Sequence, residues 1–383
     1  MRFLHTGDWH VGRLIRGRSR ADEHRAVLAE VAAIAASEQV DAVLVVGDLF
    51  DTATPSPESE AVVYEALLAL SATGASVIVL AGNHDSDRRL QAVAPLLELG
   101  HVITRPVFRK PDDGGLVELT SRDGNETALV ACLPFLSQRW VVKADDLMAG
   151  EGADAHLQYG ERIKHLLAAL TAGFRADTIN VVAAHCMVRG AQTVGSERSA
   201  QTVFEYSVDA TAFGPTPHYV ALGHLHRQQV VGGPCPIRYA GAPLMLDFGE
   251  VADAKGVLVV EAHADQPAEI TPVPLTTGRR LRVVEGTMAE VRGVAGAVGD
   301  DWLKVRVREP MRIGLADEVR ELLPNAVDVE VVRDDERDGS APVAPVRSGL
   351  TPTELFAAYL AEQQVDDPRL GVLFAELYEA ALS

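Results

Sequence analysis

Five short segments of this 383-residue chain carry Asp, Asn or His at spacings that suit a metal centre. Each segment follows a run of small and branched apolar residues. The candidate ligands are Asp8, His10, Asp48, Asn83, His185, His224 and His226. In four of the five segments a glycine directly precedes the first candidate, and glycine lets the backbone approach a bound ion or phosphate closely. The pattern predicts one site assembled from five separate segments.

The types and number of these side chains narrow the chemistry. Asp8 and His10, like His224 and His226, are two residues apart, so on an extended segment both members point to the same side. Carboxylate, amide and imidazole donors without thiolate favour Mn²⁺ or Fe²⁺, allow Zn²⁺ and fit a pure Mg²⁺ site less well. Seven candidates suit two octahedral ions that share one carboxylate. Two ions about 3.5–4 Å apart activate water and stabilise both oxygens of a displacement at phosphorus.

Each segment taken alone also has a structural explanation. A Gly-Asp pair after a strand often only closes a turn, and an isolated His-x-His often belongs to a core. Seven other histidines are interpreted as ordinary core or surface residues: His5, His24, His101, His156, His165, His218 and His263. The metal interpretation is preferred because all five segments follow apolar runs of similar length.

The apolar runs predict the elements that must position these residues. They do not alternate with polar residues, which is typical of strands buried on both faces. The predicted strands are Arg2–Thr6, Asp41–Val46, Ser76–Leu80, Thr127–Leu133, Thr178–Ala183 and His218–Leu222. Helical spacing is found at Glu23–Ser37, Ser59–Thr73 and Arg88–Leu99. This alternation predicts an α/β layered domain with the candidates at the carboxyl ends of its strands. Val230–Tyr239 and Gly256–Glu261 suggest a second, more antiparallel sheet.

Beyond about residue 275 the pattern changes. We expect a dimetal domain at residues 1–275, a small α+β capping domain at 276–335, a charged linker at 336–349 and two C-terminal helices at 350–383. The capping domain has a βαβαβ pattern. The linker contains Pro and Gly among its charges, which is typical of an inter-domain connection.

The composition excludes several classes of protein. Hydrophobic residues make up 47% of the chain, which excludes wholesale disorder. The net charge of -19 excludes a basic protein that coats nucleic acid. No apolar run approaches the ~20 residues of a membrane span, and the first residues lack a signal-peptide core. Three cysteines without CxxC spacing favour a reduced, cytoplasmic setting.

The order D-x-H, G-D-x-x-D, G-N-H-D, H, G-H-x-H resembles the calcineurin-type metallophosphoesterase superfamily. The resemblance implies a four-layer sandwich, in which two mixed β-sheets are flanked by helices. It implies that one ion is held by Asp8, His10, Asp48 and His226. It implies that the other is held by Asp48, Asn83, His185 and His224, so that Asp48 bridges.

The same resemblance implies two catalytic residues. His84, beside Asn83, would be the general acid for the leaving oxygen or would orient the phosphate. Asp51 occupies the position that orients this histidine in phosphatase relatives. The alternative for Asp51 is a turn-capping role in Asp-Thr-Ala-Thr-Pro, and Asp85 could cap the helix that follows it.

Longer segments resemble one branch, the nuclease subunits of bacterial SbcCD complexes. They are FLHTGDWHVGR, VVGDLFDTATPSPE, VLAGNHDSDRRL, YVALGHLHRQQVVGG and IRYAGAPLMLDFGE. Membership implies a Mn²⁺-dependent DNA nuclease, an exonuclease on double-strand ends and an endonuclease on hairpins, active in repair and recombination near the nucleoid. It also implies a homodimer and an SMC-like ATPase partner, SbcC, bound through the C-terminal helices. Ala242, where the family usually has Ser, and Asp51, where archaeal relatives have His, depart from the pattern.

A basic run follows the first metal segment. Arg13, Arg16, Arg18 and Arg20 could contact DNA phosphates beside the ions, or they could form a solvated loop. Two other functions remain open. A phosphomonoesterase or cyclic-nucleotide phosphodiesterase would use the same ions, and a scaffold could retain the fold without metal.

Overall fold

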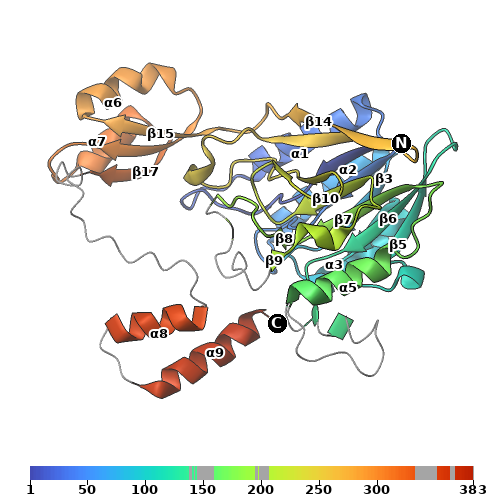
Figure 1. The fold of residues 1–383 in the computed structure, drawn as a ribbon. Coiled ribbons are helices and arrows are strands. Elements are labelled where there is room, and N and C mark those ends of the chain that lie inside the picture. The colour runs from blue at the N-terminus through green and yellow to red at the C-terminus, as the bar shows by residue number, and fades with distance from the viewer. Residues whose placement is uncertain are drawn as a thin grey trace.

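The structure is a computed structural model that describes residues 1–137, 140–141, 143–144, 159–194, 197, 207–332, 352–362 and 367–382. Two six-stranded sheets form the body of the molecule, and a third, three-stranded sheet extends from it (Figure 1). The whole predicted linker, residues 336–349, lies outside the described residues. Among the described residues, no helix is both long and apolar enough to cross a bilayer.

The first sheet has the order β14-β13-β1-β2-β3-β4. Its strands are β1 (Arg2–Thr6), β2 (Ala42–Val45), β3 (Ser76–Leu80), β4 (Val102–Arg105), β13 (Gly256–His263) and β14 (Gln266–Pro274). Strands β1 to β4 are parallel, and β13 and β14 add an antiparallel edge. The parallel strands are connected by α1 (Ala21–Ser37), α2 (Pro57–Ala72) and α3 (Asp87–Leu99). The carboxyl ends of β1, β2 and β3 therefore meet at one edge.

The second sheet has the order β11-β12-β10-β7-β6-β5. Its strands are β5 (Leu116–Thr120), β6 (Thr127–Leu133), β7 (Ile179–His185), β10 (Tyr219–Gly223), β11 (Gln229–Val231) and β12 (Ile237–Tyr239). The four central strands are parallel and both edge strands are antiparallel. Helix α5 (Tyr159–Thr171) covers its outer face, and β8 (Met187–Val188) pairs with β9 (Ser207–Val208).

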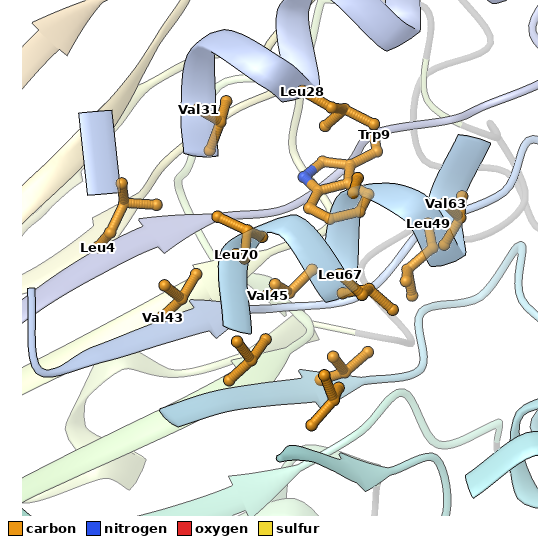
Figure 2. Close-up of a cluster of buried hydrophobic side chains, with 14 of the residues drawn as sticks. Leu4, Trp9, Leu28, Val31, Val43, Val45, Leu49, Val63, Leu67 and Leu70 are labelled. Atoms are coloured by element: carbon orange, nitrogen blue, oxygen red, sulfur yellow. The ribbon is translucent and has the colours of Figure 1, made fainter. Parts of the chain in front are cut away.

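Burial on both faces of the strands produces the four layers. Leu4 and Val43 join the core beneath α1 and α2, where Trp9 and Leu28 also pack (Figure 2). Their neighbours Phe3 and Leu44 join a core that lies between the two sheets. The order is thus helices, sheet, sheet, helix, and the predicted sandwich of two mixed sheets is confirmed.

The third sheet belongs to a small α/β unit. Its elements are β15 (Leu281–Gly286), α6 (Met288–Val294), β16 (Trp302–Val307), α7 (Leu315–Leu322) and β17 (Ala326–Val331). All three strands are parallel, and their apolar side chains pack with both helices in a separate core. Helices α8 (Pro352–Glu362) and α9 (Pro368–Leu382) form a hairpin, with the Phe356 and Phe374 rings stacked at 4.2 Å.

The prediction that Val230–Tyr239 and Gly256–Glu261 form a second, more antiparallel sheet is wrong. Strands β11 and β12 extend the second sheet, and β13 and β14 extend the first. The sequence pattern also missed β4, β5, β14 and α5. Strand β14 is an edge strand with largely exposed residues and three prolines, at Pro267, Pro272 and Pro274, so it lacks the apolar run that marks a buried strand.

Candidate metal centre

The seven candidate ligands converge at the facing carboxyl ends of the two sheets. Asp8 and His10 follow β1, Asp48 follows β2, and Asn83 follows β3. His185 ends β7, and His224 and His226 follow β10. Bonds cross between the sheets: the backbone N–H of His224 donates to Asp8 Oδ1 at 2.9 Å. Asn83 Oδ1 lies 3.0 Å from His185 Nε2 and 2.8 Å from His224 Nδ1.

Several of these residues have left-handed backbone although they are not glycine. The φ angles are 51° for Asp8, 47° for His10, 50° for Asp48 and 108° for His224. Such conformations cost about 1–3 kcal/mol each and cluster at functional sites. Asp8 and His10 therefore meet through their turn geometry, and not through strand alternation as the spacing suggested.

Glycines 47 and 82 are required by close packing around Asp48. A Cβ on Gly82 would lie 2.1 Å from Asp48 Oδ1, and one on Gly47 would lie 2.4 Å from His185 Nδ1. Both distances are far below van der Waals contact. Gly47 thus lets the first sheet approach His185 of the second, and Gly82 lets the loop after β3 approach Asp48 after β2.

The potential ligand atoms form three overlapping groups, each within 4.8 Å. They are Asp8–His10–His226, His10–Asp48–His84 and Asp48–His185–His224. Asp48 and His10 each belong to two of them, and Asp48 is the carboxylate for which the resemblance implies a bridging position. Every member of these groups is buried.

Three buried polar atoms in these groups have no hydrogen-bond partner among the described residues: Asp8 Oδ2, His10 Nε2 and His224 Nε2. An unsatisfied buried polar atom costs about 1–3 kcal/mol. Burial also raises the pKa of Asp8 to about 7, despite the charges of His185 and His226. Burial lowers the pKa of His10 to about 4 and that of His224 to about 3. Both rings are therefore uncharged at neutral pH, and each can offer a nitrogen lone pair to a cation. These residues fit divalent cations, which would satisfy the three atoms and the carboxylates together.

His84 lies beside the candidate ligands, held by backbone contacts. Its Nδ1 donates to the carbonyl oxygen of Asp51 at 2.7 Å, and its backbone N–H donates to Asp48 Oδ1 at 2.8 Å. The Asp51 carboxylate faces elsewhere, 3.6 Å from His10 Nδ1 and 3.2 Å from an Arg13 nitrogen. Asp51 therefore orients His84 through its main chain and His10 through its side chain.

Asp85 fastens the two loops that carry Asp48 and Asn83. Its carboxylate accepts hydrogen bonds from the backbone N–H groups of Gly82, Leu49 and Phe50 at 2.9–3.2 Å. Ser86, and not Asp85, caps α3 by accepting from the Arg89 N–H. The helix-cap alternative for Asp85 is therefore wrong, and its role lies within the site.

Two further residues adjoin the site although the ligand pattern of the sequence does not predict it. The Phe135 ring stacks on His224, with ring centroids 6.3 Å apart. Glu250, which is fully buried, faces His226 Nδ1 at 3.6 Å. Phe135 lies outside the motifs, and Glu250 ends the segment IRYAGAPLMLDFGE at no spacing that predicts a contact with His226. Only the fold shows that both residues adjoin the candidate ligands.

The basic run after β1 is largely engaged within the protein. Arg16 donates to Asp328 of β17 at 2.9 Å. Arg20 is buried and bonds Glu23 and the carbonyl oxygen of Met245. Arg13 pairs with Asp51. Arg18 is exposed, and its side chain forms no hydrogen bond or ion pair with a described residue.

Two basic residues of strand β16 in the third sheet are also paired within the protein. Lys304 lies 2.6 Å and Arg306 3.2 Å from Glu330, on the neighbouring strand. This sheet is fixed to the first helix, because Trp302 Nε1 donates to Glu23 at 2.8 Å. The geometry therefore connects the loop after the first metal segment to the third sheet.

Comparison with known proteins places this geometry in a family. The family model for calcineurin-like phosphoesterases matches residues 1–228, and that for the type 5 capsule protein repressor C-terminal domain matches residues 277–364. The SbcD component of the SbcCD nuclease of Bacillus subtilis is 34% identical over 291 residues, 73% of this chain and 71% of that protein. Its counterpart in Rhodobacter capsulatus is 36% identical over 283 residues, which cover 72% of this chain and 69% of that protein. The Escherichia coli K12 counterpart is 30% identical over 327 residues, which cover 81% of this chain and 76% of that protein. The chain therefore belongs to the calcineurin-like phosphoesterases, which are metal-dependent hydrolases, and within them to the SbcD family of nucleases.

Proposed function

We propose that this protein is a Mn²⁺-dependent DNA nuclease that trims double-strand ends and opens hairpins, working with an SbcC-type ATPase in DNA repair. The observation that carries the proposal is the convergence of seven ligand-type side chains around Asp48, which two potential metal groups share. The names of the relatives support the nuclease activity and the complex.

The chain's residues have distinct roles in this reaction. The first ion would be held by Asp8, His10, Asp48 and His226. The second would be held by Asp48, Asn83, His185 and His224. When bound, two such ions supply a hydroxide and offset the charge of the phosphodiester. His84 keeps Nδ1 on the Asp51 carbonyl, so Nε2 is the nitrogen that would protonate the leaving oxygen.

The direct test compares three kinds of substrate in Mn²⁺, with EDTA as the control. They are linear and hairpin duplex DNA, a cyclic nucleotide, and p-nitrophenyl phosphate. We expect cleavage of DNA that is lost in EDTA. Hydrolysis confined to the small esters would make the protein a phosphomonoesterase or cyclic-nucleotide phosphodiesterase. No turnover of any substrate in Mn²⁺ would favour a scaffold.

Arg18 is the residue of the basic run that we assign to DNA backbone contact. Arg18→Glu should weaken DNA binding and reduce the slope of log affinity against log salt by about 1, as expected for one lost phosphate contact. Fluorescence anisotropy at several salt concentrations measures both. The matched control is Arg175→Glu, since Arg175 is exposed just before β7, at the end opposite the site. Equal effects of both variants would refute the assignment.

We assign the homodimer contact to exposed leucines of α2 and α3. Leu68, Leu96 and Leu99 are 47%, 68% and 80% exposed, and exposed apolar clusters mark interaction surfaces. The double substitution Leu96→Asp and Leu99→Asp should convert a dimer of 41.0-kDa chains to a monomer, as measured by light scattering. Val230→Asp, on β11, is the control, because Val230 is 66% exposed on another face. A dimer that persists in the double variant would place the contact elsewhere.

The C-terminal helices provide the proposed surface for the ATPase partner. Exposed apolar side chains run along α9, at Val372, Leu373 and Leu377, and Tyr359 adds to them from α8. An apolar helix face of this kind suits helix-in-groove binding. The unit of residues 276–335 is proposed as the DNA-capping domain. Both assignments agree with a protein that acts in the cytoplasm, at the nucleoid.

A further inference from the structure

Glu250 and Lys255 form a buried ion pair directly behind His226. Lys255 Nζ lies 2.6 Å from Glu250 Oε2, and the side chains are 8% and 0% exposed. The other carboxylate oxygen, Oε1, lies 3.6 Å from His226 Nδ1. Lys255 also donates to the carbonyl oxygen of His226 at 3.1 Å. The pair thus contacts both the ring and the main chain of one candidate ligand.

A buried ion pair is a weak source of stability, because desolvation cancels most of the attraction. Glu250 is nevertheless a carboxylate. Lys255 Nζ, 2.6 Å from its Oε2, stabilises the charged form of this buried side chain. The Leu246 N–H donates a further bond to Oε2 at 3.1 Å. The negative charge is therefore held in place from three sides, and it faces the imidazole.

The two histidines of the Asp8–His10–His226 group share this arrangement. His10 Nδ1 faces the Asp51 carboxylate, which Arg13 holds, as His226 Nδ1 faces the Glu250 carboxylate, which Lys255 holds. In the other group, His185 Nδ1 lies 2.7 Å from the neutral carbonyl of Val46. An acceptor at Nδ1 fixes the ring proton there and directs the Nε2 lone pair to a metal, and a charged acceptor makes that lone pair more basic.

We propose that Glu250 is a positioning residue for His226, which fixes the ring and its tautomer and strengthens binding of the ion at Asp8, His10 and His226. The inference rests on the proposed metal-binding role of these residues. It predicts that the centre binds its two ions with different affinities. Substitution of Glu250 should weaken only the site that contains His10 and His226, the two histidines that face carboxylates.

The test is Mn²⁺ binding to Glu250→Gln, measured by calorimetry and by the EPR signal of free Mn²⁺, without DNA. The amide keeps the volume but removes the charge. Losing such an outer partner typically costs about 10–100-fold in metal affinity, so one of two dissociation constants should rise by that factor. Glu250→Asp, which keeps the charge on a shorter side chain, should restore part of the affinity. A purely structural role predicts the reverse order, because Gln matches the shape of Glu better than Asp does.

Glu23→Gln is the control, since Glu23 forms another largely buried ion pair, with Arg20, away from the ligands. It should change the melting temperature and leave both dissociation constants unchanged. Lys255→Met is the second variant, and it should weaken the same site while leaving the carboxylate in place. The proposal is overturned if folded Glu250→Gln and Lys255→Met proteins bind both ions as the wild type does. Because no DNA is present, this result is independent of whether the wild type cleaves DNA.

Discussion

His84→Gln is expected to lower Mn²⁺-dependent DNA cleavage by about 10²–10⁴-fold, the usual contribution of a general acid, with both ions still bound. The contacts of His84 explain this separation. Its ring is held by the Asp51 carbonyl through Nδ1, and it stands edge-on to His10 with ring centroids 4.6 Å apart. It therefore borders the proposed ligands without belonging to either set.

The role of His84 can be resolved further with the leaving group. A general acid is needed when the leaving oxygen is a sugar alkoxide, but p-nitrophenolate departs without protonation. The defect of His84→Gln should therefore shrink on bis-p-nitrophenyl phosphate compared with DNA. An equal defect on both substrates would indicate phosphate orientation instead. His165→Gln, on the exposed face of α5, should change neither rate.

Mn²⁺ titration is the second readout for the same variant. One potential ligand atom of His84 lies within 4.8 Å of one from His10 and one from Asp48. If His84→Gln loses an ion, His84 is a ligand and the general-acid assignment is wrong. If both ions bind and the rate on DNA is unchanged, His84 has no role in the chemistry.

The convergence of the seven candidate ligands was predictable because it depends on local pattern. Each apolar run is long enough to be a buried strand, and parallel strands deliver their carboxyl ends to one edge. Glycines at positions 47 and 82 added independent support, since their Cβ atoms would clash with His185 and Asp48. Strand alternation, by contrast, was the wrong reason for pairing Asp8 with His10, because both have left-handed backbone.

The direction of the Asp51 side chain shows where sequence reasoning stops. Asp51 lies three residues after Asp48, and the direction of its side chain could be predicted from that spacing only in a regular helix or strand. Asp48 has a φ of 50°, so the chain turns sharply and sends the Asp51 carboxylate to His10 and its carbonyl to His84. No spacing rule covers such a turn.

Contacts between distant segments were also beyond the sequence. Arg20 looked like part of a basic run, but it is buried against Glu23, which also accepts from Trp302, 279 residues further along the chain. Glu250 was passed over because its partner His226 is 24 residues away and belongs to another element. Both depend on tertiary packing, which single-residue patterns do not encode.

Asp48→Asn is expected to remove Mn²⁺-dependent cleavage and to weaken both ions at once. Asp48 belongs to two of the three potential metal groups and, unlike His10, which also belongs to two, carries a negative charge. Its Oδ2 lies 3.6 Å from His10 Nε2 and 3.5 Å from His185 Nε2, and its Oδ1 accepts the His84 N–H. The amide removes the negative charge common to both sites. The loss of Mn²⁺ affinity should therefore exceed about 10–100-fold, which is typical when a residue that contacts a metal ligand, but not the metal, is substituted.

Thermal unfolding with and without Mn²⁺ measures this loss without any substrate. An ion at 100 times its dissociation constant stabilises the folded state by about 2.7 kcal/mol for each site. Wild type should therefore melt higher in Mn²⁺ than in EDTA, and Asp48→Asn should show almost no difference. The increment is the rise in melting temperature from EDTA to Mn²⁺. A variant of a residue that would hold one ion only, such as His226→Gln, should keep about half of this increment.

Asp41→Asn is the matched control, because Asp41 directly precedes the same strand at its opposite end. Its carboxylate accepts from the backbone N–H groups of Arg2 at 2.7 Å and Arg122 at 2.8 Å. Losing part of these bonds should lower the melting temperature equally in Mn²⁺ and in EDTA, so the increment stays at the wild-type value. An Asp48→Asn protein that keeps the full increment would refute the bridge. One that keeps half would assign Asp48 to a single ion, and the two-ion centre would then need another shared ligand.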